Sequence, residues 1–195
     1  MVVEGLGNGR LLFARNFIKH PAMLGSVIPS SKILVDRLLT RADWGRARTI
    51  VEYGPGVGTF TAAILRRLSP NAKLLAIETN HDFVDYLQRE LDDPRLLVEC
   101  GSAADVEHIL QRRGLPKADY IISGIPFSVM PAELRQEILA STHDALQPDG
   151  AFLVYQFSNK VQRELGHTFG QVERGYVLRN VLPAHWFDCR PRTCS

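Results

Sequence analysis

Apolar residues fall into short runs that alternate with segments of helical spacing along most of the chain. The runs predict seven strands, expected over Thr49 to Glu52, Lys73 to Glu78, Arg95 to Cys100, Asp119 to Ser123, Ala151 to Phe157, Val172 to Val181 and Ala184 to Cys189. Helices are expected from near Lys32 to before Trp44, and over Thr59 to Leu68, Val106 to Arg112 and Pro131 to Leu146. A polar stretch, Ser158 to Gly170, is expected to be a connection. This alternation predicts one α/β domain over residues 1–195, with a mostly parallel sheet, an antiparallel last strand and helices on both faces.

Composition limits the possible classes of protein. The chain has 195 residues, 45% hydrophobic content and a net charge of +2, which fits a folded domain rather than a disordered one. Its three cysteines have no metal-binding spacing, and we expect reduced thiols in a cytoplasmic protein. No apolar run reaches the roughly 18 residues of a membrane span, and the N-terminus has no signal-peptide pattern.

Charge is distributed unevenly along the chain. Residues 1–48 carry eight basic and three acidic side chains, so the remainder has a net charge of −3. Between Arg10 and His20, basic residues lie beside bulky apolar ones, and Phe13 and Phe17 share a helical face. Such a helix could lie on an anionic membrane, or it could pack on the core with its charges in solvent. Residues 1–44 are therefore expected to form a helical segment that binds membrane or covers a ligand.

A glycine-rich turn follows the first strand. Glu52 ends that strand, and glycines at positions 54, 56 and 58 follow it, where glycine permits positive φ and close approach of a ligand. The spacing is neither the G-x-G-x-x-G of a pyrophosphate site nor the Gly-Lys-Ser/Thr ending of a Walker loop. The acid would repel a phosphate, whereas it suits an ammonium group. The turn resembles the first motif of class I S-adenosylmethionine-dependent methyltransferases, although a plain strand-turn-helix connection would share its glycines.

Further contacts with this cofactor are expected at the neighbouring strand ends. Glu78 ends the second strand twenty positions after Gly58, about the separation at which an acid binds ribose hydroxyls, although a solvated strand-end charge is the simpler alternative. Small residues after the third strand leave room for adenine, and the helix that begins near Lys32 could receive the cofactor's carboxylate at its N-terminus, or its serines could serve only as a local cap. The residues expected to bind S-adenosylmethionine are Ser30, Ser31, Glu52, Tyr53, Gly54, Gly56, Gly58, Thr59, Glu78, Thr79, Ser102, Ala103 and Ser123.

The loop after the fourth strand indicates the methyl acceptor. Its sequence Ser-Gly-Ile-Pro-Phe has the shape of a short element of N-methyltransferases, and a turn rich in helix breakers is the alternative. We expect the Ser123 hydroxyl and the Gly124 carbonyl to accept hydrogen bonds from a substrate amine, and Phe127 to cover that amine with its π face. In-line methyl transfer from a sulfonium depends largely on positioning, and no metal is required. The residues assigned to catalysis are Ser123, Gly124, Ile125, Pro126 and Phe127.

Nearly the whole chain resembles the bacterial phospholipid N-methyltransferases of the soluble, peripheral type. The resemblance rests on residues 28–31, 51–58, 123–127, 131, 156–157 and 179–184, followed by Trp186. It implies a Rossmann-like class I methyltransferase fold with S-adenosylmethionine as cofactor, and methylation of phosphatidylethanolamine up to three times to give phosphatidylcholine. It also implies peripheral association with an anionic membrane through the N-terminal helix, with no nucleic acid as partner. Members usually have Gly-Asp-Ala where this chain has Gly101-Ser102-Ala103, so a hydroxyl stands in place of a carboxylate that grips the adenine amino group.

Two other functions stay open. Ribosomal RNA adenine N6-dimethyltransferases share a similar glycine loop, and a basic N-terminal segment attracts RNA phosphates as well as lipid phosphates. Serine rather than asparagine at position 123, and the end of the sequence soon after the seventh strand, argue against that function. The third hypothesis, favoured by Ser102, is a membrane-surface protein that binds the cofactor without turning it over.

Overall fold

The computed structural model describes residues 32–178 and 183–191, so the expected features between Arg10 and His20 and at Ser30 and Ser31 lie outside the described residues. In chain order the elements are α3 (Lys32–Leu39), β1 (Thr49–Tyr53), α4 (Thr59–Leu65), β2 (Lys73–Glu78), α5 (His81–Glu90), β3 (Leu96–Cys100), η2 (Ala103–Asp105), α6 (Val106–Arg112), β4 (Ala118–Ser123), η3 (Phe127–Val129), α7 (Ala132–Ala145), β5 (Leu146–Gln156), α8 (Gln162–Phe169), β6 (Gln171–Val177) and β7 (Ala184–Arg190).

The described strands form one seven-stranded sheet in the order β3-β2-β1-β4-β5-β7-β6. Strands β1 to β5 pair in parallel with their neighbours, and β7 runs antiparallel to both β5 and β6. All five residues of β1 are buried, as expected for a central parallel strand that is covered on both faces. The predicted Rossmann-like fold, with an antiparallel strand last in the chain, is therefore confirmed.

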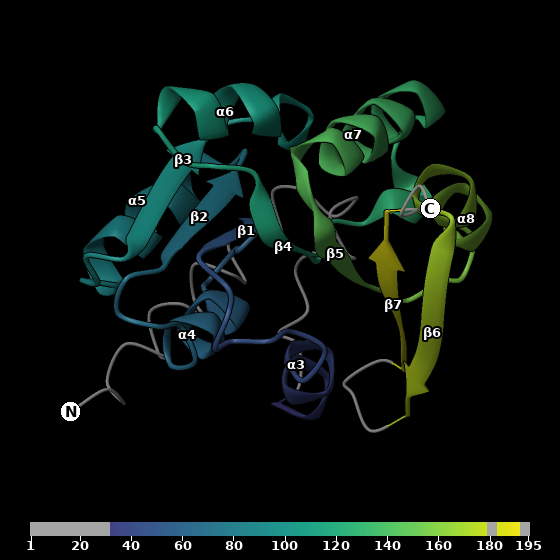
Figure 1. The fold of residues 1–195 in the computed structure, drawn as a ribbon, viewed down its shortest axis with the longest axis horizontal. Helices are drawn as coiled ribbons and strands as arrows, with labels where there is room; N and C mark the ends of the chain where they lie inside the picture. Colours follow the sequence, from purple (N-terminus) through teal and green to yellow (C-terminus); the bar gives the residue numbers. More distant parts are fainter. Residues whose placement is uncertain (1–31, 179–182, 192–195) are drawn as a thin grey trace.

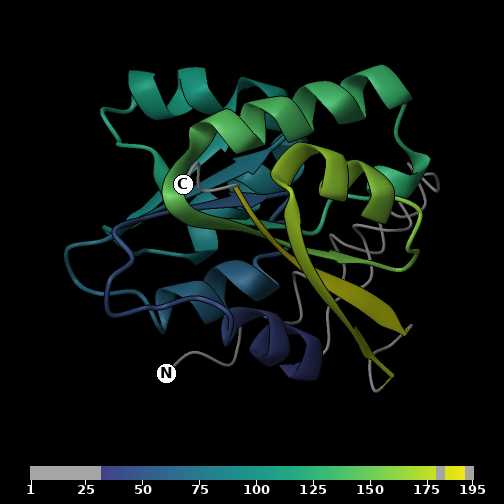
Figure 2. The same ribbon diagram turned by 45° about the vertical axis from the view of Figure 1, so that its right-hand side comes forward.

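Helices cover the two faces of the sheet, with α6, α7 and α8 on one face and α3 and α4 on the other (Figures 1 and 2). Each face has its own apolar core. The first core includes Val106, Ile109, Ile138, Leu139, Leu165 and Phe169 from the helices. The second includes Leu34, Leu38, Phe60 and Ile64. Helix α5 packs against β2 and β3.

The structure differs from the expected elements in several places. The polar stretch expected to be a connection contains α8, which is anchored by the buried side chains of Leu165 and Phe169. Helix α5, capped by the Asn80 side chain, follows Glu78 directly and was not delineated from the sequence. Strand β5 begins at Leu146 rather than at Ala151, since it continues through a register shift in its pairing with β4. The predicted strand over Val172 to Val181 is found as Gln171–Val177, and residues 179–182 lie outside the described ranges.

Among the described residues, no helix has both the length and the apolar character needed to cross a membrane.

Candidate functional site

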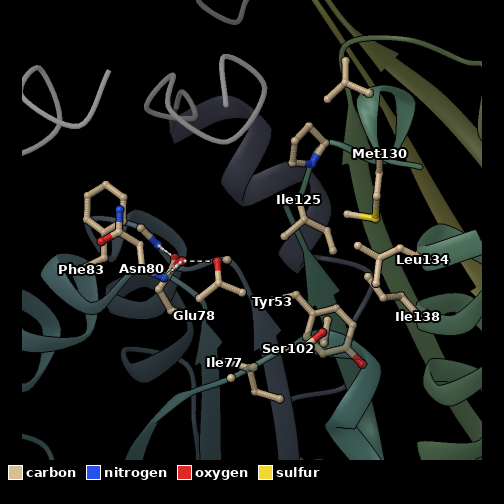
Figure 3. A pocket seen from close by; sticks show the side chains of 17 residues that line it. Tyr53, Ile77, Glu78, Asn80, Phe83, Ser102, Ile125, Met130, Leu134 and Ile138 are labelled. Atoms are coloured by element: carbon tan, nitrogen blue, oxygen red, sulfur yellow. Dashed lines mark hydrogen bonds between the residues drawn. The ribbon is translucent and has the colours of Figure 1, made fainter. Parts of the chain in front are cut away.

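A cavity of ≈ 280 Å³ lies at the carboxyl ends of β1, β2, β3 and β4, where open α/β sheets hold their ligands. Figure 3 shows Glu78, Asn80 and Phe83 on one side and Ile125, Met130, Leu134 and Ile138 on the other. The cavity thus has a polar side and an apolar side. Its lining comprises Tyr53, Gly54, Gly56, Ile77, Glu78, Thr79, Asn80, Phe83, Gly101, Ser102, Ala103, Ile125, Pro126, Val129, Met130, Leu134 and Ile138.

The turn after β1 needs glycine for two different reasons. Gly54, Gly56 and Gly58 all have positive φ, at 65°, 55° and 81°, a region that other residues adopt only with strain. A Cβ on Gly54 would lie 2.7 Å from Ile125 Cγ2, so this glycine also lets the loop after β4 approach. A Cβ on Gly56 would meet no atom within 4 Å, which leaves open space in front of the turn. Gly58 instead packs towards Leu87 of α5, where an added Cβ would lie 2.8 Å from Leu87 Cδ2.

Glu78 is held at the cavity by backbone donors. The Gly56 N–H donates to its Oε2 at 3.1 Å, and the Asn80 N–H donates to its Oε1 at 3.0 Å. Burial raises the pKa of this carboxyl, and the hydrogen bonds from Asn80 and Gly56 oppose that rise by stabilising the charged form. The bond from Gly56 ties the acid to the glycine turn, so the end of β2 and the turn after β1 form one unit.

Ser102 and Ala103 lie just after β3 and line the cavity, where small residues were expected to leave room for adenine. The Ser102 hydroxyl accepts a hydrogen bond from the Ala104 N–H at 3.1 Å and so caps the short helix η2. Ser102 therefore has both a local structural role and a place in the cavity wall.

The apolar side of the cavity comes mainly from the start of α7. Leu134 and Ile138, four residues apart on α7, and Met130, which lies between η3 and α7, line this side of the cavity (Figure 3). Tyr53 lies against this side, because its hydroxyl shares a hydrogen bond of 3.1 Å with the Thr142 hydroxyl of the same helix. Val129, at the end of η3, lines the cavity while 67% of it is exposed to solvent. Apolar side chains therefore continue from the cavity to the protein surface.

The loop from Ser123 to Phe127 reaches the cavity with only part of its residues. Ile125 and Pro126 line it, whereas Ser123 is fully buried and its hydroxyl accepts from the Ile125 N–H at 3.4 Å. Phe127 is also fully buried and packs edge-on against Phe152 in the core. In this structure Phe127 is a core residue, and the expectation that its face covers an amine is not met, because its ring is fully buried and does not line the cavity.

Glu52 is the clearest difference from the sequence expectations. Side chains alternate along β1, so Tyr53 faces the cavity while Glu52 points towards α4, where its Oε2 accepts from the Thr61 hydroxyl at 2.7 Å. Burial raises its pKa to about 8, and the hydrogen bond from Thr61 limits that rise. A buried acid in this position does not reach the cavity, so the expected pairing with an ammonium is not formed by this geometry.

The expected cofactor residues therefore divide into three groups, one of which, Ser30 and Ser31, lies outside the described residues. Those that line the cavity are Tyr53, Gly54, Gly56, Glu78, Thr79, Ser102 and Ala103. Those outside the lining are Glu52, Gly58, Thr59 and Ser123, and of the residues assigned to catalysis Gly124 and Phe127 also lie outside it. The lining residues that the sequence did not predict are Ile77, Asn80, Phe83, Gly101, Val129, Met130, Leu134 and Ile138. The available signals were the capping position of Asn80 before a helical pattern and the four-residue spacing of Leu134 and Ile138 on α7.

This arrangement fits an adenosine-bearing sulfonium cofactor. The Glu78 carboxylate supplies acceptors for ribose hydroxyls, and the space beside Ser102 and Ile125 is flanked by apolar atoms that suit a flat base. The open space at Gly56 accommodates a ligand against the backbone. When bound, such a cofactor supplies a methyl group that is activated by the positive sulfur.

Comparison with known proteins agrees with the geometry. The profile of the family described as "MTS: Methyltransferase small domain" matches residues 16–177. An ornithine lipid N-methyltransferase of Singulisphaera acidiphila is 32% identical over 92% of this chain and 94% of its own length. A ribosomal RNA small subunit methyltransferase A of Gloeobacter violaceus is 27% identical over 83% of this chain, and the match spans 60% of that protein. In fold, the chain is similar to the Streptomyces achromogenes O-methyltransferase TomG, solved with S-adenosylmethionine, with a TM-score of 0.66, 16% identity, and coverage of 92% and 89% of the two chains.

Proposed function

Because this chain belongs to the methyltransferase small domain family and is an S-adenosylmethionine-dependent N-methyltransferase, we propose that it methylates the primary amine of a membrane lipid. The observation that carries the proposal is the 32% identity to an ornithine lipid N-methyltransferase, which extends over 94% of that protein. An ornithine head group and an ethanolamine head group both present a primary amine. Phosphatidylethanolamine, the acceptor expected from the sequence, is the finer form of the proposal.

The shape of the cavity supports an amphipathic acceptor. Glu78 and Asn80 form the polar side, while Val129 and Leu134 extend the apolar side to the surface, with exposed fractions of 67% and 37%. A lipid head group that enters along this apolar margin keeps its glycerol or acyl portion in contact with apolar side chains. Its neutral amine would be oriented by the loop that contains Ile125 and Pro126, since these residues reach the cavity. Orientation of two reacting groups is the main contribution that a protein makes to such a displacement.

Residues 1–31 form part of the proposal but lie outside the described residues. Their basic and apolar side chains support attachment to an anionic bilayer surface. Removal of residues 1–18 should therefore weaken binding to vesicles that contain phosphatidylglycerol, and the loss should be largest at low salt. Unchanged sedimentation with these vesicles would contradict the membrane role.

The acceptor is tested by incubating the full chain with labelled S-adenosylmethionine and three acceptors. These are vesicles with phosphatidylethanolamine, vesicles with ornithine lipid, and unmethylated small-subunit ribosomal RNA. Label in either lipid supports the proposal, and the two vesicle types decide between the head groups. Label in RNA alone would overturn it. The RNA arm is needed because several curated relatives are ribosomal RNA methyltransferases, although this chain spans 60% or less of those proteins.

A further inference from the structure

Residues 124–131, here called the acceptor loop, join β4 to α7 and carry Ile125 and Pro126 into the cavity. Phe127 of this loop is fully buried, and Ile125 and Met130 are partly buried and pack against the same core. Side chains from β5 and α7 bind its backbone directly, and a side chain from α8 binds the one from α7.

Gln156 of β5 holds the first part of the acceptor loop. Its Nε2 donates to the Ile125 carbonyl at 2.7 Å, and the same carbonyl accepts from the Phe127 N–H at 3.0 Å. Gln156 is 3% exposed, so this hydrogen bond is shielded from water.

Arg135 of α7 holds the second part. Its Nη1 donates to the carbonyls of Phe127 and Met130, at 3.1 Å and 3.0 Å, which lie at the two ends of the η3 turn. The other side of the guanidinium binds both carboxylate oxygens of Glu164 on α8, with a distance of 2.9 Å from Nη2 to Oε1. The side chains of Arg135 and Glu164 are 17% and 27% exposed. A bidentate pair of this kind fixes the plane of the guanidinium and hence the direction of its remaining donors.

The carbonyls of Ile125, Pro126, Phe127, Met130 and Pro131 all accept hydrogen bonds from described residues. These bonds fix the loop backbone at and after Ile125 and Pro126, the two residues of the predicted amine-binding motif that line the cavity. Resting on the proposed function, we propose that Arg135, oriented by Glu164, is a positioning residue for methyl transfer: it fixes the acceptor loop so that Ile125 and Pro126 keep their places in the cavity wall, where the loop orients the substrate amine. Arg135 touches neither substrate nor cofactor in this role, and it acts through the loop backbone.

Lysine at position 135 separates this role from simple stability. It keeps the positive charge but lacks the planar fork, so it cannot bind Glu164 in bidentate fashion and two carbonyls together. Arg95 is a matched control, because it also binds one carboxylate, that of Asp93, and two carbonyls, those of Leu65 and Leu68, with a similar exposure of 23%. None of these four control residues lines the cavity.

The experiment compares Arg135→Lys, Glu164→Gln and Arg95→Lys with the wild type by three measurements: hydrogen exchange of residues 124–131, affinity for S-adenosylmethionine, and kcat and KM for the acceptor that takes label. We expect Arg135→Lys to speed exchange of the acceptor loop about tenfold and to lower kcat about 10- to 100-fold, with cofactor affinity changed by less than about threefold. Glu164→Gln should give a smaller change of the same kind. Arg95→Lys should lower the melting temperature while leaving loop exchange and kcat as in the wild type.

Loop exchange in Arg135→Lys that matches the wild type would overturn the inference, whichever acceptor is methylated. A loss of kcat no larger than that of Arg95→Lys at an equal loss of melting temperature would also overturn it, since both would then reflect stability alone. If the wild type labels only RNA, the proposed lipid function fails. The kinetic comparison is then made with RNA, and it decides the role of Arg135 separately.

Discussion

Replacing Glu52 with glutamine tests the role that the structure gives to this buried carboxyl. Its oxygen accepts from the Thr61 hydroxyl at 2.7 Å on the side of β1 that faces α4. Burial raises its pKa from 4.5 to about 8. The folded protein therefore retains this proton over a pH range in which the unfolded chain has already released it.

The size of the effect follows from this range. From 4.5 to about 8 is a span of about 3.5 pH units, and each unit corresponds to about 1.4 kcal/mol. Because the folded pKa lies above the unfolded value, the stability associated with the proton is complete below pH 4.5. It is lost as the pH rises towards 8. The unfolding free energy lost in this way reaches about 5 kcal/mol at most. Glutamine does not titrate, so Glu52→Gln does not show this loss.

The assay is urea unfolding at several pH values between 5 and 8, with Glu107→Gln, an exposed carboxyl on α6, as the control. Relative to Glu52→Gln, the wild type should lose several kcal/mol of unfolding free energy across this range. The hydrogen bond from Arg95 lowers the pKa of Asp93, and this group is present in all three proteins. Burial lowers the pKa of His185, and its contribution is common to all three proteins and cancels.

Cofactor affinity provides the second half of the test. Since Glu52 does not line the cavity, Glu52→Gln should bind S-adenosylmethionine within about twofold of the wild type in calorimetry at pH 7. If the unfolding free energies of the wild type and Glu52→Gln depend on pH in the same way, the raised pKa of Glu52 is refuted. A tenfold or larger loss of affinity, about 1.4 kcal/mol, would show that the carboxylate serves the cofactor's ammonium, as the sequence suggested.

Three further substitutions test the cavity. Glu78→Ala should weaken S-adenosylmethionine binding about 10- to 100-fold in calorimetry, because hydrogen bonds to a charged group contribute about 1.5–3 kcal/mol, and unchanged affinity would remove Glu78 from the site. Gly54→Ala should lower the melting temperature more than Gly114→Ala, since both have positive φ but only Gly54 would also clash, with Ile125; equal losses would contradict the close approach. Ser102→Asp keeps a residue able to cap η2 and should tighten cofactor binding several-fold, about 1 kcal/mol, if a carboxylate grips adenine; weaker binding would argue against that contact.

The sheet could be predicted because parallel strands covered on both faces are near-continuous apolar runs. Their carboxyl ends meet at one edge, so Glu78 and Ser102 could be placed at the same site from their positions after successive strands. Glu52 also follows this positional rule, yet it lies elsewhere. Neighbouring side chains on a strand point to opposite faces of the sheet, so Glu52 faces α4 while Tyr53 faces the cavity. The spacing of a motif does not reveal which of the two faces the ligand uses.

The missed residues have a different cause. Leu134 and Ile138 have the four-residue spacing of any helix that packs on a core, so nothing in the pattern separates a cavity wall from buried packing. Helix α8 was missed because its apolar residues are few, with Leu165 and Phe169 as its buried side chains.

The sequence also did not reveal which side chains hold the loop expected to bind the acceptor. The sequence Ser-Gly-Ile-Pro-Phe indicates an amine-binding loop, but the backbone of that loop is held by Gln156 and by Arg135, which Glu164 orients in turn. A motif specifies the atoms that could bind an amine, whereas the partners of its backbone decide which of those atoms face the substrate. Ser123 shows the difference, since its hydroxyl is buried and binds the Ile125 N–H. On the proposed positioning role, substitutions of Arg135 and Glu164 should change methyl transfer to the acceptor without altering the residues expected to bind the cofactor.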